Sequence, residues 1–155
     1  MRGWAKHLES LREQYRQIFE VNVFGVAAVT EAFLPLIRRS SYPDRRIVNV
    51  SSGVGLITMA GEEGYEFNAR ACYVPEYRSS KAALNMITVV QSIKFADENI
   101  AVIAAAPGMC RTRFTGGQGM KDASDGAMAI VHAATEGDPK KLTGTFVANE
   151  AHLGW

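Results

Sequence analysis

Apolar residues recur at helical spacing in three parts of the chain, and each part has its own start or end signal. The first helix is predicted to start after Ser10, because Ser10 and Glu13 form the capping-box pattern S-x-x-E, and to end within residues 38–41. A second long helix is predicted over residues 76–97. Ser124 is the predicted N-cap of a third helix.

Three short segments of β-branched or small apolar residues predict buried strands. They cover residues 46–50 (RIVNV), 100–106 (IAVIAAA) and 143–149 (TGTFVAN). The alternation of helix and strand along the chain predicts an α/β fold, in which helical crossovers join the strands of a parallel sheet. We expect a single domain over residues 1–155, because the chain has the length of one domain and shows no repeats.

The connection at residues 53–75 has no hydrophobic period and contains four glycines. Long irregular connections inside a compact domain are usually functional or mobile. Its aromatic residues, with residues that follow the second strand, are compatible with an apolar ketone or polyketide-like substrate. These residues are Tyr65, Phe67, Tyr73, Phe114, Gly116 and Gly117.

Composition and charge argue against several classes of protein. The 155 residues are 47% hydrophobic and 21% charged, which is ordinary for a soluble globular protein. A net charge of +1 gives no electrostatic reason to expect nucleic acid or an acidic membrane as partner. No uninterrupted apolar run reaches the roughly 18 residues of a membrane span. The first residues, MRGWAKHLES, lack the apolar block of a secretory signal, so a cytoplasmic protein is expected.

Residues that commonly bind metals are few and widely scattered. The chain has two cysteines, Cys72 and Cys110, and three histidines, His7, His132 and His152. Neither set has the spacing of metal ligands. We interpret all five as structural or surface residues and expect no metal site.

Tyr77 and Lys81 lie four residues apart at the start of the second predicted helix, so their side chains can share one face. A lysine beside a phenol favours the phenolate and lowers the phenol pKa from about 10, which suits proton transfer. The same spacing is common by chance, and on its own it favours a surface tyrosine beside a solvated lysine.

Other polar residues occupy ordered places in the same pattern. Ser52 follows the first predicted strand, and α/β sheets place ligand-binding groups at that end of a strand. Pro107 and Gly108 end the next strand, with Thr112 shortly after. Asn22 places an amide among apolar residues of the first helix, where its hydrogen bonds need partners. Each has a structural explanation as a turn residue, a strand stop or a core amide, but together they favour a site.

In this order the segments VNVFG, RIVNVSS, YRSSK and APGMCRT closely resemble the motifs of the short-chain dehydrogenase/reductase family. The resemblance implies a Rossmann-like, doubly wound parallel sheet. It also implies an NAD(P)-dependent oxidoreductase that reduces a carbonyl or oxidises an alcohol, here on a small apolar substrate of secondary-metabolite type. NADP is the expected cofactor, with NAD as the alternative.

The resemblance also assigns roles to residues. Tyr77 would be the general acid in reduction, or the base in the reverse direction, and Ser52 would bind the substrate oxygen. Lys81 would lower the tyrosine pKa and hold the nicotinamide ribose hydroxyls, while Asn22 would keep a water in the proton relay. The catalytic set is thus Asn22, Ser52, Tyr77 and Lys81, and the cofactor-binding set is Tyr77, Lys81, Pro107, Gly108, Met109 and Thr112.

One part of the family pattern is missing from this sequence. The family holds the cofactor pyrophosphate on a glycine-rich turn between a strand and a helix, and no such turn precedes the first helix here. We therefore expect about three strands with long helices, lacking the N-terminal glycine-rich βαβ half. Cofactor binding is in doubt for the same reason.

Three hypotheses follow from this partial match. The chain is an enzyme by itself, or a non-catalytic subunit that associates with a full-length reductase through its two long helices, or a fragment of a longer protein. Because a strand left at the sheet edge and the apolar faces beside it need covering, we expect a homo- or hetero-oligomer.

Overall fold

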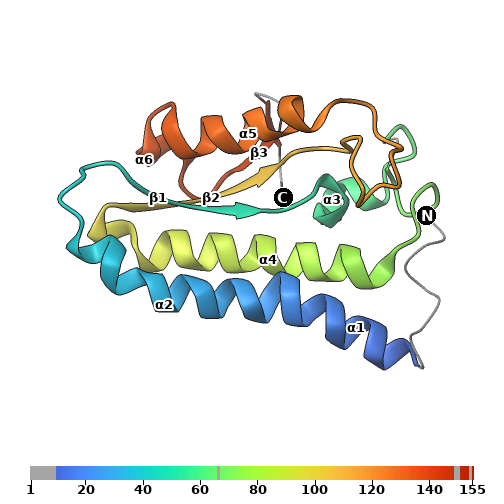
Figure 1. The fold of residues 1–155 in the computed structure, drawn as a ribbon, viewed down its shortest axis with the longest axis horizontal. Helices are drawn as coiled ribbons and strands as arrows, with labels where there is room; N and C mark the ends of the chain where they lie inside the picture. The colour runs from blue at the N-terminus through green and yellow to red at the C-terminus, as the bar shows by residue number, and fades with distance from the viewer. Residues whose placement is uncertain (1–9, 66, 149–150, 154) are drawn as a thin grey trace.

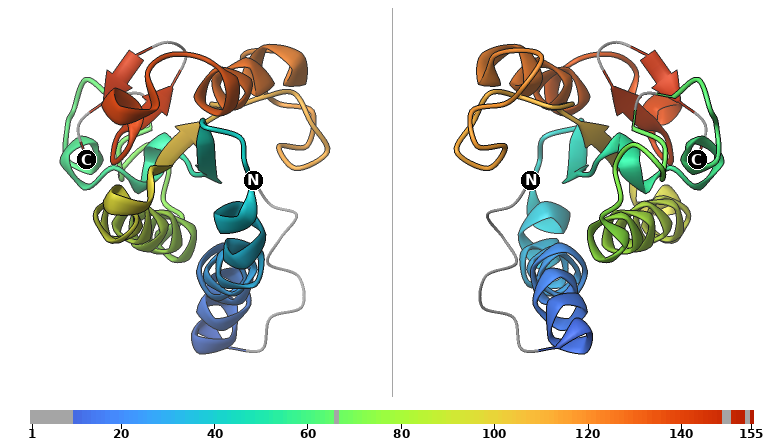
Figure 2. Two further views of the ribbon diagram at one scale, coloured as in Figure 1. Left: turned by 90° about the vertical axis from the view of Figure 1, so that its left-hand side faces the viewer. Right: turned by 90° about the vertical axis from the view of Figure 1, so that its right-hand side faces the viewer.

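The computed structural model describes residues 10–65, 67–148, 151–153 and 155. In chain order its elements are α1 (Leu11–Phe19), a π-helical segment (Glu20–Gly25), α2 (Val26–Arg39), β1 (Arg45–Val50), a 3-10 turn (Gly53–Gly55), α3 (Ile57–Ala60), α4 (Pro75–Lys94), a second 3-10 turn (Ala96–Glu98), β2 (Ile100–Ala106), α5 (Ala123–Thr135), α6 (Pro139–Leu142), β3 (Phe146–Ala148) and β4 (Ala151–Leu153). The sheet lies between two groups of helices (Figure 1). The end-on views place α1, α2 and α4 on one face and α5 and α6 on the other (Figure 2).

The sheet has the strand order β1-β2-β3-β4. β1, β2 and β3 are parallel neighbours, which confirms the predicted α/β fold and its three-stranded parallel sheet. β4 pairs antiparallel with β3 and is not predicted by the sequence pattern, because three residues are too few to show a period. The third strand is also shorter than predicted: it begins at Phe146, and residue 149 lies outside the described residues.

The register of β1 and β2 brings the two expected site segments together. Arg45 lies opposite Ile100 and Val50 opposite Ala105, so both strands end at the same edge of the sheet. The Ser51 N–H continues the ladder by donating to the Ala105 carbonyl at 2.8 Å. Ligands of parallel α/β sheets bind outside this carboxyl edge.

The first helical run begins as predicted. The Ser10 hydroxyl accepts the Glu13 N–H at 3.2 Å, as an N-cap should. The Glu13 carboxylate bonds to Arg16 and Gln17, so it stabilises the first turns of the helix through side-chain pairs. The run continues to Arg39 through the π-helical segment Glu20–Gly25.

The later helices differ from prediction at their ends. α4 starts one residue earlier, with Pro75 in its first turn, and ends at Lys94 because the chain tightens into a 3-10 turn closed by Asn99 at φ 53°. The N-cap of α5 is Asp122 and not Ser124, which lies inside the first turn. Both differences arise at helix ends, where local hydrogen bonds decide the boundary.

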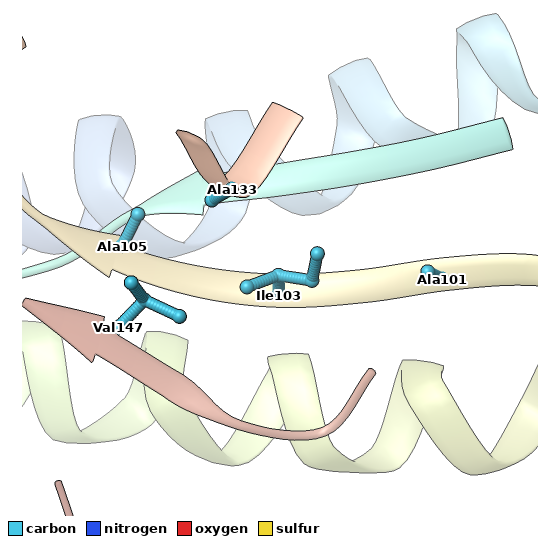
Figure 3. Packing of buried hydrophobic residues seen from close by; sticks show 5 residues of the cluster. All are labelled: Ala101, Ile103, Ala105, Ala133 and Val147. Atoms are coloured by element: carbon cyan, nitrogen blue, oxygen red, sulfur yellow. The ribbon is translucent and has the colours of Figure 1, made fainter. Parts of the chain in front are cut away.

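β2 is the centre of the hydrophobic core, and every one of its residues is buried. Its side chains alternate between the two faces of the sheet. Ala101, Ile103 and Ala105 pack with Ala133 of α5 and Val147 of β3 (Figure 3). On the opposite face, Ile100 and Val102 pack with Leu34 and Phe95.

The helical run Leu11–Arg39 corrects the expectation that no segment could span a membrane. By length and composition this run is long and apolar enough to cross a membrane, and little of it is buried in the structure. The sequence search for uninterrupted apolar runs missed it because scattered polar residues divide the stretch. Helices in the core of soluble proteins pass the same test, so the finding by itself is weak evidence for a membrane.

Candidate active site

A stripe of polar side chains runs along the face of α4 that packs against the sheet. Tyr77, Lys81 and Asn85 follow one another at intervals of four residues, and Thr88 continues the row. Lys81, Asn85 and Thr88 are buried. Burying polar groups is costly unless they are hydrogen bonded, so their partners indicate what the stripe is for.

The inner part of this polar stripe fixes the end of β1. The Asn49 amide donates to the Thr88 hydroxyl at 2.9 Å, and the Ser51 hydroxyl donates to the Asn85 carbonyl oxygen at 2.5 Å. The Asn85 amide in turn donates to the Gly55 carbonyl at 3.3 Å. The turn that follows β1 is therefore tied to α4 by buried hydrogen bonds.

Across this turn the structure brings the Ser52 side chain close enough to Tyr77 to act on the pKa of its phenol. Gly55 allows the turn to approach α4 closely. A Cβ atom on Gly55 would lie 2.7 Å from the Lys81 Cβ and 2.8 Å from the Lys81 carbonyl carbon. The glycine is thus needed for the contact that places the serine beside the tyrosine.

Lys81 is a buried cation beside Tyr77. Its side chain donates to the Val50 carbonyl at 3.0 Å, and its Nζ lies 5.6 Å from the centroid of the Tyr77 ring. Only 8% of the residue is exposed, and within the described part of the chain no carboxylate forms an ion pair with it. Burial lowers the pKa of the Lys81 ammonium.

The pKa of Tyr77 is shifted in the direction opposite to the sequence expectation. Burial raises the pKa of the phenol, while the hydrogen bond with Ser52 acts in the lowering direction and is the smaller effect. Lys81 does not offset this burial, because its ammonium is directed to the Val50 carbonyl and is itself destabilised by burial. In this structure Tyr77 is therefore held as a neutral phenol.

Asn22 lies in the π-helical segment Glu20–Gly25 and faces α4. Its amide donates to the Ser80 hydroxyl at 3.1 Å, and Ser80 donates to the Tyr77 carbonyl at 2.7 Å. The contact explains how this amide is satisfied and places it one residue from Lys81 along α4. Single π-helical turns inside α-helices are frequent at functional sites.

The segment after β2 turns back toward the same edge. Gly108 adopts the left-handed region with φ 73°, and the Met109 carbonyl accepts the Met120 N–H at 2.8 Å. The Thr112 N–H donates to the Thr115 hydroxyl at 3.1 Å. Within this loop the ring of Phe114 lies 6.2 Å from that of Tyr77, centroid to centroid. Pro107, Gly108, Met109 and Thr112 are thus linked to the tyrosine through Phe114.

Several residues of the site are missing from the sequence prediction. The spacing of Asn85 and Thr88 behind Lys81 is a readable signal, because polar residues at helical intervals predict a buried polar face. Arg78 has no such signal. Its guanidinium bonds to three backbone carbonyls of the connection before α4, and carbonyl acceptors leave no side-chain pattern in the sequence.

The residues present fit one end of a nicotinamide cofactor. Lys81 uses one N–H donor on the Val50 carbonyl, and its ammonium makes no other hydrogen bond among the described residues, so further donors can meet the ribose hydroxyls. Tyr77 and the segment from Pro107 to Thr112 lie at the same sheet edge. A glycine-rich pyrophosphate turn before the first helix is absent from the sequence, so the fit covers the nicotinamide end alone. Among the residues described here, no group of three or more histidine, cysteine or acidic side chains could hold a metal ion.

Comparison with known sequences gives a consistent result. The sequence model of the family described as short chain dehydrogenase matches residues 3–122. The chain is 55% identical over 149 residues to the short-chain dehydrogenase anuI of Penicillium roqueforti, covering 94% of this chain and 59% of that protein. It is 33% identical over 108 residues to estradiol 17-beta-dehydrogenase 2 of Mus musculus, covering 70% of this chain and 24% of that protein.

Solved structures share the fold over nearly the whole chain. The NADPH-bound carbonyl reductase from chicken fatty liver superposes with a TM-score of 0.77 at 23% identity, covering 95% of this chain and 59% of that chain. The RhlG/NADP active-site complex of Pseudomonas aeruginosa superposes with a TM-score of 0.65 at 25% identity, covering 94% of this chain and 60% of that one. The chain spans less than two thirds of the length of these relatives, and its site segments, its partial Rossmann fold and the match over residues 3–122 together show that it belongs to the short-chain dehydrogenase family.

Proposed function

We propose that this chain contains the catalytic part of an NAD(P)-dependent oxidoreductase, which interconverts a carbonyl and an alcohol on a small apolar substrate. The observation that supports this best is the close approach of Ser52 and Tyr77 beside the buried Lys81 ammonium, at the carboxyl edge of a parallel sheet. The similarity to structures that hold NADPH and NADP favours NADP as cofactor.

In this proposal each of the four side chains has its own role in the reaction. The bound cofactor supplies a hydride in reduction and accepts one in oxidation. Ser52 donates a hydrogen bond to the substrate oxygen, and Tyr77 gives that oxygen its proton. Lys81 holds the ribose hydroxyls with the N–H donors that Val50 leaves available. Asn22, which bonds to Ser80 next to Lys81, orders a water that returns the proton.

The protonation state of Tyr77 suits a proton donor, as carbonyl reduction requires. A phenol whose pKa is raised by burial stays protonated at neutral pH, so Tyr77 starts the reaction as a proton donor. The surroundings favour an apolar substrate, since Phe114 lies against Tyr77 and the pair Tyr65 and Phe67 lies in the connection after Ser52. A small ketone, including one of secondary-metabolite type, fits these contacts.

The test is a titration of purified residues 1–155 with NADPH and NADH, followed by nicotinamide fluorescence. We expect saturable binding that weakens in Lys81→Ala, because the ammonium would no longer meet the ribose. Lys94→Ala is the matched control, since Lys94 is exposed and lies at the far end of the same helix. Substrate screening with small apolar ketones then uses Tyr77→Phe, which should abolish turnover.

The absence of binding up to millimolar cofactor would contradict an enzyme that works alone. It would agree with the missing pyrophosphate turn, which supplies much of the contact in full-length relatives. Equal binding by the chain and by Lys81→Ala would contradict the proposed role of the lysine.

A second candidate function is a subunit that associates with a full-length reductase or with another copy of the chain. The observation in its favour is that both long helical runs present large apolar side chains to solvent, and that β1 pairs within the described sheet only with β2. A shallow hollow lined by Arg12, Tyr15, Arg16, Phe19 and Phe24 lies on the first run. The exposed apolar residues are Leu11, Val21, Phe24, Val29, Phe33 and Leu36 of the first run, and Met86, Val90 and Ile93 of α4.

Light scattering of the chain, alone and mixed with a full-length short-chain dehydrogenase, tests this candidate. Association should be lost in the double variant Phe33→Glu with Ile93→Glu, because each change puts a charge on an apolar contact surface. A monomeric chain whose reductase activity disappears in Tyr77→Phe would rule out the purely structural subunit.

A further inference from the structure

A single guanidinium bonds to the connection between β1 and α4, residues 53–74, at widely separated points. Arg78 donates to the carbonyls of Val54 at 2.9 Å, of Cys72 at 2.9 Å and of Phe67. These acceptors lie near the beginning, the middle and the end of the 53–74 segment, whose course from β1 to α4 is visible in Figure 1. The rigid fork of an arginine can bridge several carbonyls in this way, whereas a lysine has one nitrogen.

The other hydrogen bonds of this segment are mostly local. The Ala69 N–H donates to the Ala60 carbonyl at 2.9 Å, and the Cys72 N–H donates to the Asn68 carbonyl at 3.0 Å. The ion pair of Arg70 and Glu63 spans 3.5 Å between side chains that are 89% and 85% exposed, so it contributes little. These contacts shape the segment but do not attach it to α4. The Asn85 amide of α4 holds the start of the segment through the Gly55 carbonyl, whereas Arg78 bonds to its beginning, middle and end.

The attached segment reaches the catalytic turn. A Cβ atom on Gly53, the residue after Ser52, would lie 2.5 Å from the Tyr65 hydroxyl. The Tyr65 phenol therefore lies against the Ser52–Gly53 turn. The end of the segment leads directly into α4, and Tyr77 lies in the first turn of that helix.

We infer that Arg78 is a positioning residue of the active site, which holds the 53–74 segment so that Tyr65 lines the substrate pocket beside Ser52. This inference rests on the proposed function, since it assigns Tyr65 to the substrate side of the same site. Arg78 bonds to backbone carbonyls and acts through the segment. The pocket thus has an aromatic, hydroxyl-bearing wall suited to a ketone with an apolar body.

The first experiment measures amide hydrogen exchange in Arg78→Ala and Arg78→Lys. We expect the amides of Ala69 and Cys72 to exchange about tenfold faster or more in Arg78→Ala, because several charge-assisted bonds are lost. Arg78→Lys should give a smaller increase. The amides of β2 should stay protected, and the matched control Arg70→Ala should exchange as the unchanged chain does.

The inference is overturned if both Arg78 variants keep the exchange rates of the unchanged chain at Ala69 and Cys72. If Arg78→Ala also loses protection in β2, it has unfolded, and Arg78→Lys decides the question. A faster exchange of the segment in Arg78→Lys with β2 intact supports the inference, and unchanged exchange overturns it.

The second experiment follows Tyr65 by its nitration with tetranitromethane, read by mass spectrometry on the tryptic peptide 47–70, which contains no other tyrosine. Gly53→Ala should raise the rate severalfold, because its Cβ displaces the Tyr65 hydroxyl. Gly61→Ala is the matched control in the same segment, since a Cβ there meets nothing within 4 Å. Arg78→Lys should also raise the rate, and equal rates in all variants would overturn the placement of Tyr65.

These measurements need neither cofactor nor turnover, so they separate this inference from the proposed function. A segment that opens in Arg78→Ala, in a chain that binds no NADPH, would support the inference and contradict the autonomous enzyme. If amide exchange in the segment is the same in the Arg78 variants as in the unmodified chain, and NADPH binding depends on Lys81, the inference is overturned and the proposed function is supported.

Discussion

The two ends of α4 contact the same sheet in different ways. Near the carboxyl edge, the helix presents hydrogen-bonded polar side chains to β1 and the turn after it. At its far end, where the chain passes from α4 into β2, Phe95 packs with Leu34 and Ile100 in an apolar cluster. The polar residues are Tyr77, Lys81, Asn85 and Thr88, with their partners Asn49, Ser51 and Ser52.

The comparison shows that the polar row of α4 lies near the carboxyl edge of the sheet, where parallel sheets bind ligands, and does not extend along the whole face of the sheet. An apolar stripe along all of α4 would bury the same surface without needing any hydrogen-bond partner. The apolar clusters on both faces of β2 show that such packing is available here. Polar side chains are also buried elsewhere, as Ser92 of α4 and Thr30 of α2 are. The hydrogen-bonded cluster at the carboxyl edge is nevertheless best explained by the chemistry of a site, because ligands of parallel sheets bind there.

The largest expected effect lies on the apolar side of this comparison. Ile103→Ala should lower the free energy of unfolding by about 3 kcal/mol, because it leaves a cavity in a cluster whose central side chain is fully buried. Urea denaturation followed by circular dichroism measures it. Ile103→Val should cost about 1 kcal/mol. A smaller loss in Ile103→Ala than in Ile103→Val would contradict the packing described for this face.

Gly55→Ala should have the next largest effect, and it should change both stability and the arrangement of the site. The new Cβ would meet Lys81 backbone and side-chain atoms at 2.8 and 2.7 Å, so the turn and α4 must separate. We expect a loss of about 2 kcal/mol together with loss of the contact between Ser52 and Tyr77. Gly61→Ala, with open space at its Cβ, should change stability little in the same urea experiment. Equal stability of the two variants would show that the turn does not depend on close approach.

Lys81→Met should increase stability while removing the cofactor binding that we propose. The folded-state pKa of the ammonium is lowered, so its contribution to stability is present above the unfolded value and is lost as pH falls through the folded pKa. At neutral pH the buried charge therefore costs free energy, and an apolar side chain of similar length should recover about 1 kcal/mol. Lys94→Met removes an exposed lysine from the same helix and should change little. Thermal unfolding at pH 7 compares the variants, and a destabilised Lys81→Met would contradict the cost assigned to the charge.

Much of the fold can be predicted from the sequence, because periodicity reports which faces are buried. The strands at 46–50 and 100–106 and the capped start at Ser10 match the structure closely. The antiparallel strand β4 cannot be predicted in this way, since it is defined by its pairing with β3.

The site is predictable to a smaller degree. Motif resemblance selects Ser52, Tyr77 and Lys81, and the structure brings them together. The direction of the Tyr77 pKa shift is not predictable from spacing, because burial of the phenol outweighs the proximity that Y-x-x-x-K implies. Arg78 is hidden from sequence reasoning for a different reason, since its partners are backbone carbonyls.

The smallest expected effect tests the Ser52 and Tyr77 pair directly. The hydrogen bond from Ser52 acts to lower the pKa of Tyr77 against the effect of burial, so Ser52→Ala should raise that pKa further. Absorbance at about 295 nm follows tyrosine ionisation above pH 10, where phenols titrate. The difference between the single variant Ser52→Ala and the double variant Ser52→Ala with Tyr77→Phe isolates the ionisation of Tyr77.

The same titration has a consequence for stability. Because the folded-state pKa of Tyr77 is raised, its contribution to stability is fully present below the unfolded value of about 10 and is lost as pH rises through the folded value. Ser52→Ala should therefore lose slightly more stability at alkaline pH than the unmodified chain does, after correction for the lost hydrogen bond, because the gap between the unfolded and folded pKa values of Tyr77 widens. If Tyr77 instead titrates below the ordinary phenol value in the unmodified chain, Lys81 outweighs burial. The tyrosine would then be poised as a base, and alcohol oxidation would be favoured over carbonyl reduction.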